Sequence, residues 1–80
     1  MDSETESVVK AIADQMRAEI AACGKTITSV ARETGIHYQS LYRYMHGTRD
    51  IPASIIVKVA GSVGVEPSLI MSRAYERLIS

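Results

Sequence analysis

Four glycines divide this chain into short segments that share one periodicity. In the first segment, apolar residues recur at spacings of three and four: Val9, Ile12, Met16 and Ile20. That spacing is typical of an amphipathic helix, which buries one face against a core. Glycine is often found just beyond the C-terminus of a helix, so the glycines at positions 24, 35, 47 and 64 mark helix ends.

The segments after the first glycine predict four further helices. Thr26 is a suitable N-cap for a helix that ends at Gly35, and a third helix covers residues 38–46. A fourth helix starts at Pro52 or just after it, and Pro67 starts a fifth that runs to about residue 79. The inward residues of the third and fourth helices are Leu41, Tyr44, Met45, Ile56, Val59, Ala60 and Val63. Strand signals are weak, so we expect an all-α fold, a compact five-helix domain.

The chain has the composition of one small soluble domain, with 80 residues, 46% of them hydrophobic and 22% charged. We expect residues 1–6 to be a disordered tail and residues 7–80 to form a single domain. The lone Cys23 cannot form an intrachain disulfide, which fits a reducing compartment, and we expect it to fill a small buried space. The acidic start is unlike a secretory signal, and no apolar run reaches the ~18 residues of a membrane helix. These features predict a cytoplasmic protein, in bacteria or in a host cell, with no membrane partner.

Charge is unevenly distributed along a chain whose net charge is zero. The first 24 residues contain two basic and five acidic residues, which gives a charge of −3. Residues 25–49 have a charge of +3, because Lys25, Arg32, Arg43 and Arg49 stand against Glu33 alone. A positive segment attracts a polyanion locally even in a neutral molecule, so this pattern permits a nucleic-acid partner without proving one.

The stretch from Ile27 to Gly47, ITSVARETGIHYQSLYRYMHG, contains two short helices joined by a three-residue turn. Gly35 accepts the positive φ that a sharp reversal requires. The small Ala31 lets the two helices cross closely, and Ile36 fills the space beneath the turn. Small, glycine and apolar residues in these positions are the pattern of a helix-turn-helix, which here covers about residues 27–47.

The same stretch resembles the Cro/Xre, or lambda-repressor-like, family of helix-turn-helix DNA-binding proteins. The resemblance continues through GTRD and a proline to the segment KVAGSVGV at residues 58–65, and it covers about residues 26–71. It implies a lambda-repressor-like fold in which the second motif helix enters the major groove of double-stranded DNA. The function it implies is sequence-specific regulation of transcription, as a repressor of the phage or prophage type that binds a palindromic operator.

The second motif helix supplies the candidates for base readout. If Leu41, Tyr44 and Met45 point inward, the outward residues of this helix are Tyr38, Gln39, Tyr42, Arg43 and His46. The resemblance implies base contacts from Tyr38, Gln39 and Arg43, and Tyr42 joins them as an outward neighbour. A glutamine can bind adenine and an arginine guanine, each through two hydrogen bonds, whereas the tyrosines could contact thymine methyl groups or donate a hydroxyl to phosphate.

Six residues are candidates for contacts with DNA phosphates. They are Thr26, Thr28, His37, His46, Thr48 and Arg49. The first two lie at a predicted helix N-terminus, where hydroxyls, backbone N–H groups and the helix dipole favour an anion. The two histidines lie in the turn and on the outward face. The resemblance implies that residues 48 and 49 contact phosphates from the loop that follows the recognition helix.

The last predicted helix, residues 67–79, carries more apolar surface than the domain can bury. Ile70, Ala74 and Leu78 are expected to dock on the core, and the apolar residues left outside it are Leu69, Met71, Tyr75 and Ile79. An apolar remainder of this kind often marks an interface, so we expect a homodimer through this helix. The alternative is a monomer in which the helix only caps the core.

No residue pattern indicates catalysis or a metal site. His37 and His46 lack the spacing of zinc ligands, and no serine has a histidine and an acid in a local catalytic pattern. We therefore expect no enzyme activity, no cofactor and no small-molecule substrate. Two other functions stay open: an antitoxin-type module that binds a protein partner and regulates its own gene through DNA binding, and an architectural recombination factor that bends DNA.

Overall fold

The described residues form five helices, as the sequence predicts. The structure, a computed structural model, describes residues 3–47 and 49–80. The helices are α1 (Ser3–Ala22), α2 (Ile27–Thr34), α3 (Tyr38–His46), α4 (Ala53–Val63) and α5 (Pro67–Ile79). The described residues include no strand, which confirms the all-α fold. The predicted bounds of α3 and α5 agree with the structure.

Helix α1 begins earlier than its apolar stripe indicates. Residues 3–6, for which the sequence predicts a disordered tail, form its first turn, and residues 1 and 2 of that tail lie outside the described residues. Glu4 and Glu6 favour a helix start because their carboxylates face the positive end of the helix dipole. The Ser7 hydroxyl also donates to the Ser3 carbonyl over 2.9 Å. Periodicity missed this turn because none of its residues is apolar.

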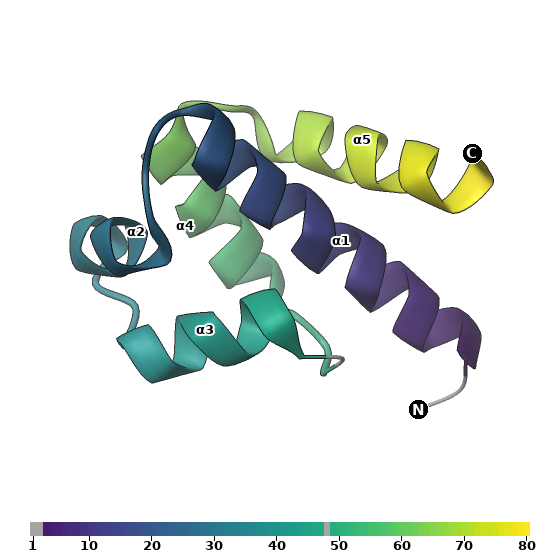
Figure 1. The fold of residues 1–80 in the computed structure, drawn as a ribbon, viewed down its shortest axis with the longest axis horizontal. Coiled ribbons are helices and arrows are strands. Elements are labelled where there is room, and N and C mark those ends of the chain that lie inside the picture. Colours follow the sequence, from purple (N-terminus) through teal and green to yellow (C-terminus); the bar gives the residue numbers. More distant parts are fainter. Residues whose placement is uncertain (1–2, 48) are drawn as a thin grey trace.

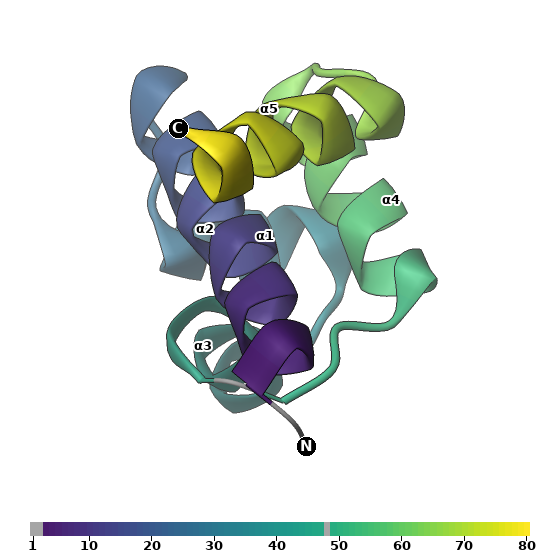
Figure 2. The ribbon, with the colours of Figure 1, turned by 90° about the vertical axis from the view of Figure 1, so that its right-hand side faces the viewer.

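Helix α1 is the central element of the fold. Figures 1 and 2 show it running between α5 on one side and α3 on the other, with α2 and α4 completing the bundle. Each helix contributes at least one fully buried side chain to a single core: Met16, Val30, Leu41, Met45, Val59 and Ile70. Because the core is shared, no helix packs independently of the others.

The turn between α2 and α3 has the geometry that the sequence predicts. Gly35 has a φ of 76°, and its N–H donates to the Ala31 carbonyl over 2.9 Å, which ends α2. Ile36, directly after it, is buried beneath the turn, and Ala31 is buried where the two helices meet. The left-handed backbone at Gly35 therefore sends α3 away from α2 at a steep angle.

A buried polar network fixes α5 to α1. Arg73 Nη1 donates to Glu19 Oε2 over 2.6 Å, and Gln15 Nε2 donates to the same oxygen over 2.7 Å. Arg77 Nε completes the network by donating to Gln15 Oε1 over 2.8 Å. Only 7% of the Glu19 side chain is exposed, and the hydrogen bond from Arg73 holds the pKa of this carboxyl below its usual range. Each of these four side chains therefore forms a hydrogen bond with at least one other member of the network.

Two residues predicted to be buried are exposed. Leu78 is 40% exposed, because a stripe with a spacing of four residues rotates by about 40° at each step and leaves the core after Ile70 and Ala74. Arg77 lies closer to α1 and binds Gln15 instead. Cys23 is exposed in the turn that follows α1, where its thiol donates to the Ile20 carbonyl over 3.3 Å.

No single helix among the described residues is long and apolar enough to cross a membrane. Helices α4 and α5 together have the required length and composition, but the two are bent by 106° relative to each other.

Replacing Gly35 with alanine should destabilise the fold by about 1–2 kcal/mol, the usual cost of placing a side chain in the left-handed region. A Cβ at this position would meet no atom within 4 Å, so the loss comes from the backbone conformation alone. Urea unfolding measures it. Gly61→Ala is the matched control, since Gly61 lies within α4 with open space around it, and alanine there should stabilise by about 0.5–1 kcal/mol. Equal effects of both changes would contradict the assigned turn.

The Glu19 carboxyl should make stability fall in acid. Its pKa is lower in the folded state than in the unfolded chain, so its contribution is present above the unfolded value, about 4.3, and is lost as the pH falls through the folded value. We expect the urea midpoint of Glu19→Gln to depend less on pH between 5 and 3 than that of the unaltered protein. Glu76→Gln, an exposed change on α5, serves as the control and should keep the original dependence. Identical slopes for all three proteins would exclude this role for Glu19.

Candidate nucleic-acid interface

Helix α3 presents to solvent the residues that the sequence places on its outer face. Leu41 and Met45 are fully buried, and Tyr44 is half-buried against the core. The outward residues are all exposed: Tyr38, Gln39, Tyr42, Arg43 and His46. Helical spacing explains this division, since positions three and four apart share a face.

The outer face of α3 consists of two parallel stripes. Tyr38, Tyr42 and His46 form an aromatic stripe, with ring centroids 6.0 Å apart for the first pair and 4.4 Å apart for the second. Gln39 and Arg43 form a polar stripe beside it, in which Arg43 Nε donates to the Gln39 carbonyl over 3.4 Å. That bond leaves both Nη groups of the guanidinium free to bind a ligand.

Two open hollows lie along these stripes. One, of about 330 Å³, is lined by Tyr42, Arg43, His46, Gly47 and Arg49. The other, of about 290 Å³, is lined by Tyr38, Gln39, Tyr42 and Arg43. Because both hollows are open to solvent, they suit contact with the edge of a large molecule better than enclosure of a small ligand.

The C-terminus of α3 is held by α1, a contact that the sequence analysis did not identify. Arg17 Nε donates to the Met45 carbonyl over 2.9 Å, and its guanidinium also pairs with Asp14. A hydrogen bond from Lys10 holds the pKa of Asp14 below its usual range, so the carboxylate stays ionised beside the arginine. Arg17 and Met45 are 28 residues apart, and no local pattern relates them.

Glycine is required at position 47, directly after α3, for a steric reason. Its N–H donates to the Arg43 carbonyl over 2.8 Å, and a Cβ on Gly47 would lie only 2.6 Å from that oxygen. The loop that follows brings the exposed Arg49 back to α3, with its guanidinium carbon 6.0 Å from the centroid of the Tyr44 ring. Thr48, the other phosphate candidate in this loop, lies outside the described residues.

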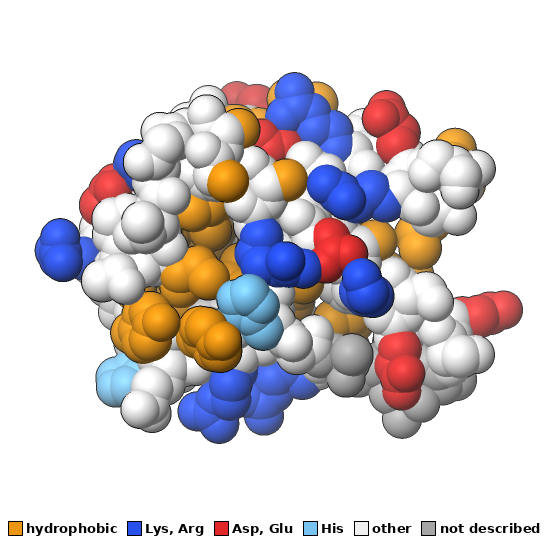
Figure 3. Space-filling view, viewed as in Figure 1, with side chains coloured by type: hydrophobic (Ala, Val, Ile, Leu, Met, Phe, Trp, Pro, Cys, Tyr) orange, Lys and Arg blue, Asp and Glu red, His pale blue; other side chains and the backbone are white. Residues whose placement is uncertain are grey.

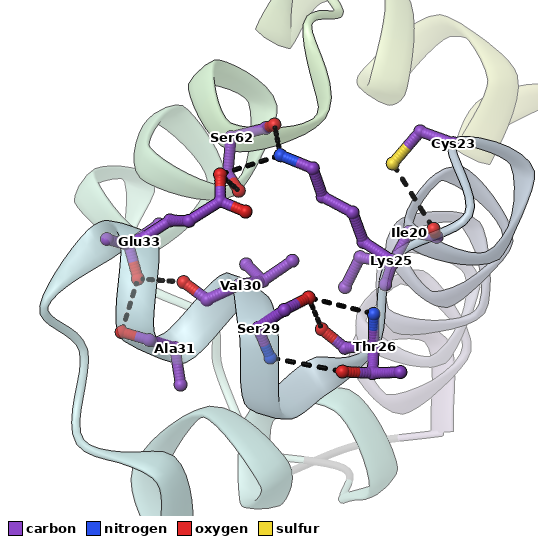
Figure 4. Close-up of polar contacts among 10 residues, drawn as sticks. Ile20, Cys23, Lys25, Thr26, Ser29, Val30, Ala31, Glu33 and Ser62 are labelled. Atoms are coloured by element: carbon purple, nitrogen blue, oxygen red, sulfur yellow. Dashed lines mark hydrogen bonds and ion pairs between the residues drawn. The ribbon is translucent and has the colours of Figure 1, made fainter.

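The N-terminus of α2 is capped and open to solvent. The Thr26 hydroxyl accepts from the Ser29 N–H over 3.1 Å, and the Ser29 hydroxyl accepts from the Thr26 N–H over 3.0 Å, a reciprocal capping box (Figure 4). Thr26 and Thr28 are both exposed, and the capping box leaves the Thr26 O–H free to donate. The backbone N–H groups of Ile27 and Thr28 precede the first helical hydrogen bond, which Val30 donates, whereas the Ser29 N–H is taken by the cap.

The two histidines lie at opposite ends of α3. His37 is the residue before the first turn, it is exposed, and its side chain forms no capping hydrogen bond. His46 is exposed in the last turn, where its ring lies against Tyr42. Helix α3 therefore has an exposed imidazole near each end.

One of the four basic residues of the positive segment, residues 25–49, binds other residues of the domain. Lys25 Nζ donates over 2.6 Å both to Glu33 Oε2 and to the Ser62 carbonyl at the end of α4 (Figure 4), and it holds the pKa of Glu33 below its usual range. No carboxylate in the described part of the chain lies within ion-pair distance of the other three cations: Arg32, Arg43 and Arg49. In Figure 3 no acidic side chain is visible over α3.

Helix α5 leaves several large apolar side chains exposed to solvent. The exposed fraction is 40% for Leu69, 42% for Met71, 61% for Tyr75 and 67% for Ile79. Met71, Tyr75 and Ile79 are spaced by four residues and share one face. Leu69 lies on nearly the opposite side from Met71, because two residues turn by about 200°.

The described residues hold no group of three or more histidine, cysteine, aspartate or glutamate side chains arranged to bind a metal ion.

The comparisons with known proteins agree with this geometry. A family model described as helix-turn-helix, of the Cro/C1 type, matches residues 15–70, which is more than half of the chain and includes both motif helices. Searches of curated proteins and of solved structures find no match. The chain therefore belongs to the Cro/C1-type helix-turn-helix family, whose members are DNA-binding regulators of transcription.

Proposed function

We propose that this regulator is a repressor that binds a palindromic operator in double-stranded DNA as a homodimer and blocks access of RNA polymerase. The observation that carries the proposal is the outer face of α3, where Gln39 and Arg43 are exposed and no carboxylate is present. We further propose that it acts in the cytoplasm, where it reaches DNA. Its assignment to the phage or prophage type rests on the family resemblance.

Base readout is proposed for the polar stripe of α3. The Gln39 amide matches the N6 and N7 edge of adenine, and the free Nη groups of Arg43 match the O6 and N7 edge of guanine. Each pairing discriminates against a wrong base by about 1–3 kcal/mol. Tyr38 and Tyr42 would lie against the neighbouring bases.

Phosphate contacts are proposed on both sides of α3. At the N-terminus of α2, the hydroxyls of Thr26 and Thr28 and the free backbone N–H groups suit one strand. On the other side, Arg49 suits a phosphate near the end of α3, and Thr48 is proposed beside it from the family resemblance. His37 and His46 are proposed as additional phosphate contacts at the two ends of the helix.

Dimerisation is proposed through the apolar face of α5. Met71, Tyr75 and Ile79 form a stripe that a second copy could cover by twofold symmetry. Leu69, on the other side of the helix, would contact the partner only at the edge. To bind two half-sites one turn apart on DNA, the proposed dimer must hold its two α3 helices about 34 Å apart.

A selection of bound duplexes from a random pool tests base readout. Arg43→Ala should relax the preference at one base position of each half-site, because a bidentate contact worth about 1–3 kcal/mol is lost. Arg49→Ala should weaken binding to all sequences alike and lower the slope of log affinity against log salt by about one, because a phosphate contact is lost.

Lys58→Ala is the control for this comparison. It removes one positive charge from α4, a helix with no proposed DNA contact, and should leave the selected sequence unchanged. Equal, sequence-independent losses for Arg43→Ala and Arg49→Ala would contradict the assignment of Arg43 to base readout.

Light scattering on the purified protein in solution measures its mass and so tests the proposed dimer. At tens of micromolar we expect twice the chain mass of 8.7 kDa, and Tyr75→Glu should restore the monomer, because a charge would be buried at the interface. Val8→Glu, at an exposed apolar position of α1, should remain a dimer. A monomer for the unaltered protein, with or without operator, would contradict the homodimer and favour a protein partner on α5, as in the antitoxin alternative.

A further inference from the structure

An open apolar groove lies where α4 and α5 meet. The two helices are bent by 106° relative to each other (Figure 2), and the groove beside the bend has a volume of about 340 Å³. Val57, which lines it, is 55% exposed although its side chain is aliphatic. Apart from Glu66, the other lining residues are also apolar or glycine: Ala60, Gly61, Gly64, Val65 and Pro67. The groove therefore exposes apolar surface that the domain itself does not cover.

The groove continues into the apolar stripe of α5. Pro67 lines the groove and stands four residues before Met71, the first residue of the stripe, so both lie on one side of the helix. Rows of residues four apart on two helices interdigitate in the commonest class of helix packing. If a twofold axis passes between Met71 and Tyr75, Ile79 of a second copy comes to lie beside Pro67 and the groove.

The stripe alone is small for a stable interface. Its three side chains, Met71, Tyr75 and Ile79, are 42%, 61% and 67% exposed. A large side chain has at most about 250 Å² to bury, so the three together can bury only about 400 Å². A standard interface buries about 800 Å² on each partner, so surface beside the stripe must supply the rest. The groove is apolar surface in that position.

Resting on the proposed homodimer, we infer that the groove receives the Ile79 side chain of a second copy, and that by symmetry each copy fills the groove of the other. The four carbon atoms of this side chain match an apolar lining. They also fit the volume, since a cavity of about 150 Å³ holds benzene, which has six carbon atoms. Ile79 is the most exposed of the large apolar side chains in the described part of the chain, so it has the most surface to bury.

Filling the groove from its own side tests the inference. A Cβ on Gly61 would meet no atom within 4 Å, and Gly61 lies inside α4, so leucine fits there without strain and favours the helix. Gly61→Leu would occupy the space for Ile79. The dissociation constant of the dimer should rise about tenfold or more, the factor for losing one buried aliphatic side chain. Light scattering over a range of protein concentrations measures it.

A second change assigns the effect to Ile79. In the double variant that combines Gly61→Leu with Ile79→Ala, alanine vacates the space that leucine fills, so the dimer should be stronger than with Gly61→Leu alone. Arg32→Leu is the matched control. It adds leucine to an exposed position of α2, which does not pack against α5 in the described part of the chain, and should leave the dissociation constant unchanged. Urea unfolding at concentrations where every variant is a monomer should show Gly61→Leu at least as stable as the unaltered protein, which excludes unfolding as the cause.

Three results would overturn the inference. If Gly61→Leu dimerises as strongly as the unaltered protein, the groove lies outside the interface, and the proposed homodimer stands on α5 alone. If the double variant is no stronger than Gly61→Leu, Ile79 does not enter the groove. If the unaltered protein is a monomer at tens of micromolar, the inference fails together with the proposed homodimer.

Discussion

The left-handed backbone at Gly35 sets the direction of α3, and the outer face of α3 depends on that direction. Because the chain changes direction within the three residues between α2 and α3, Ile36 closes the core beneath the turn, and Leu41 and Met45 point inward from the next helix. Helical geometry then leaves the opposite positions in solvent, and these are the aromatic and polar stripes. If α2 continued straight through Gly35, Leu41 and Met45 would not be buried in the core. The aromatic and polar stripes would then not be presented to solvent on the opposite side of α3.

Helix α1 holds the recognition helix and α5 on opposite sides of the domain (Figure 2). On one side, Arg17 binds the Met45 carbonyl at the end of α3, and on the other, Glu19 and Gln15 bind two arginines of α5. The proposed DNA surface and the proposed dimer surface therefore do not compete for space. Rigid attachment to one helix would also keep the distance between two recognition helices constant in a dimer.

The features that the sequence predicts correctly are those with a short period or a strong local preference. The ends of α2 and α3 follow from the glycines after them, and the exposure of Gln39 and Arg43 follows from the apolar stripe on the other side of α3. The contacts that the sequence analysis missed join residues that are far apart in the sequence and close together in the fold. Arg73 reaches Glu19 across 54 residues, and Lys25, which the sequence analysis counts in the positive segment, binds Glu33 and the end of α4. The first turn of α1 was missed because acidic residues stabilise it without any apolar stripe.

A chain with zero net charge can still have a positively charged surface at α3, because its carboxylates pair with cations elsewhere in the fold. Asp14, Glu19 and Glu33 each bind a cation within the fold, so these carboxylates are neutralised away from the outer face of α3. The arginines of α3 and of the loop after it have no such partner among the described residues. At physiological salt, a charge is screened beyond about 8 Å, so a DNA phosphate responds to the nearby arginines more than to the total charge. A neutral protein of this kind would gain little from non-specific attraction, so the proposed base contacts and the proposed dimerisation would supply most of its affinity for an operator.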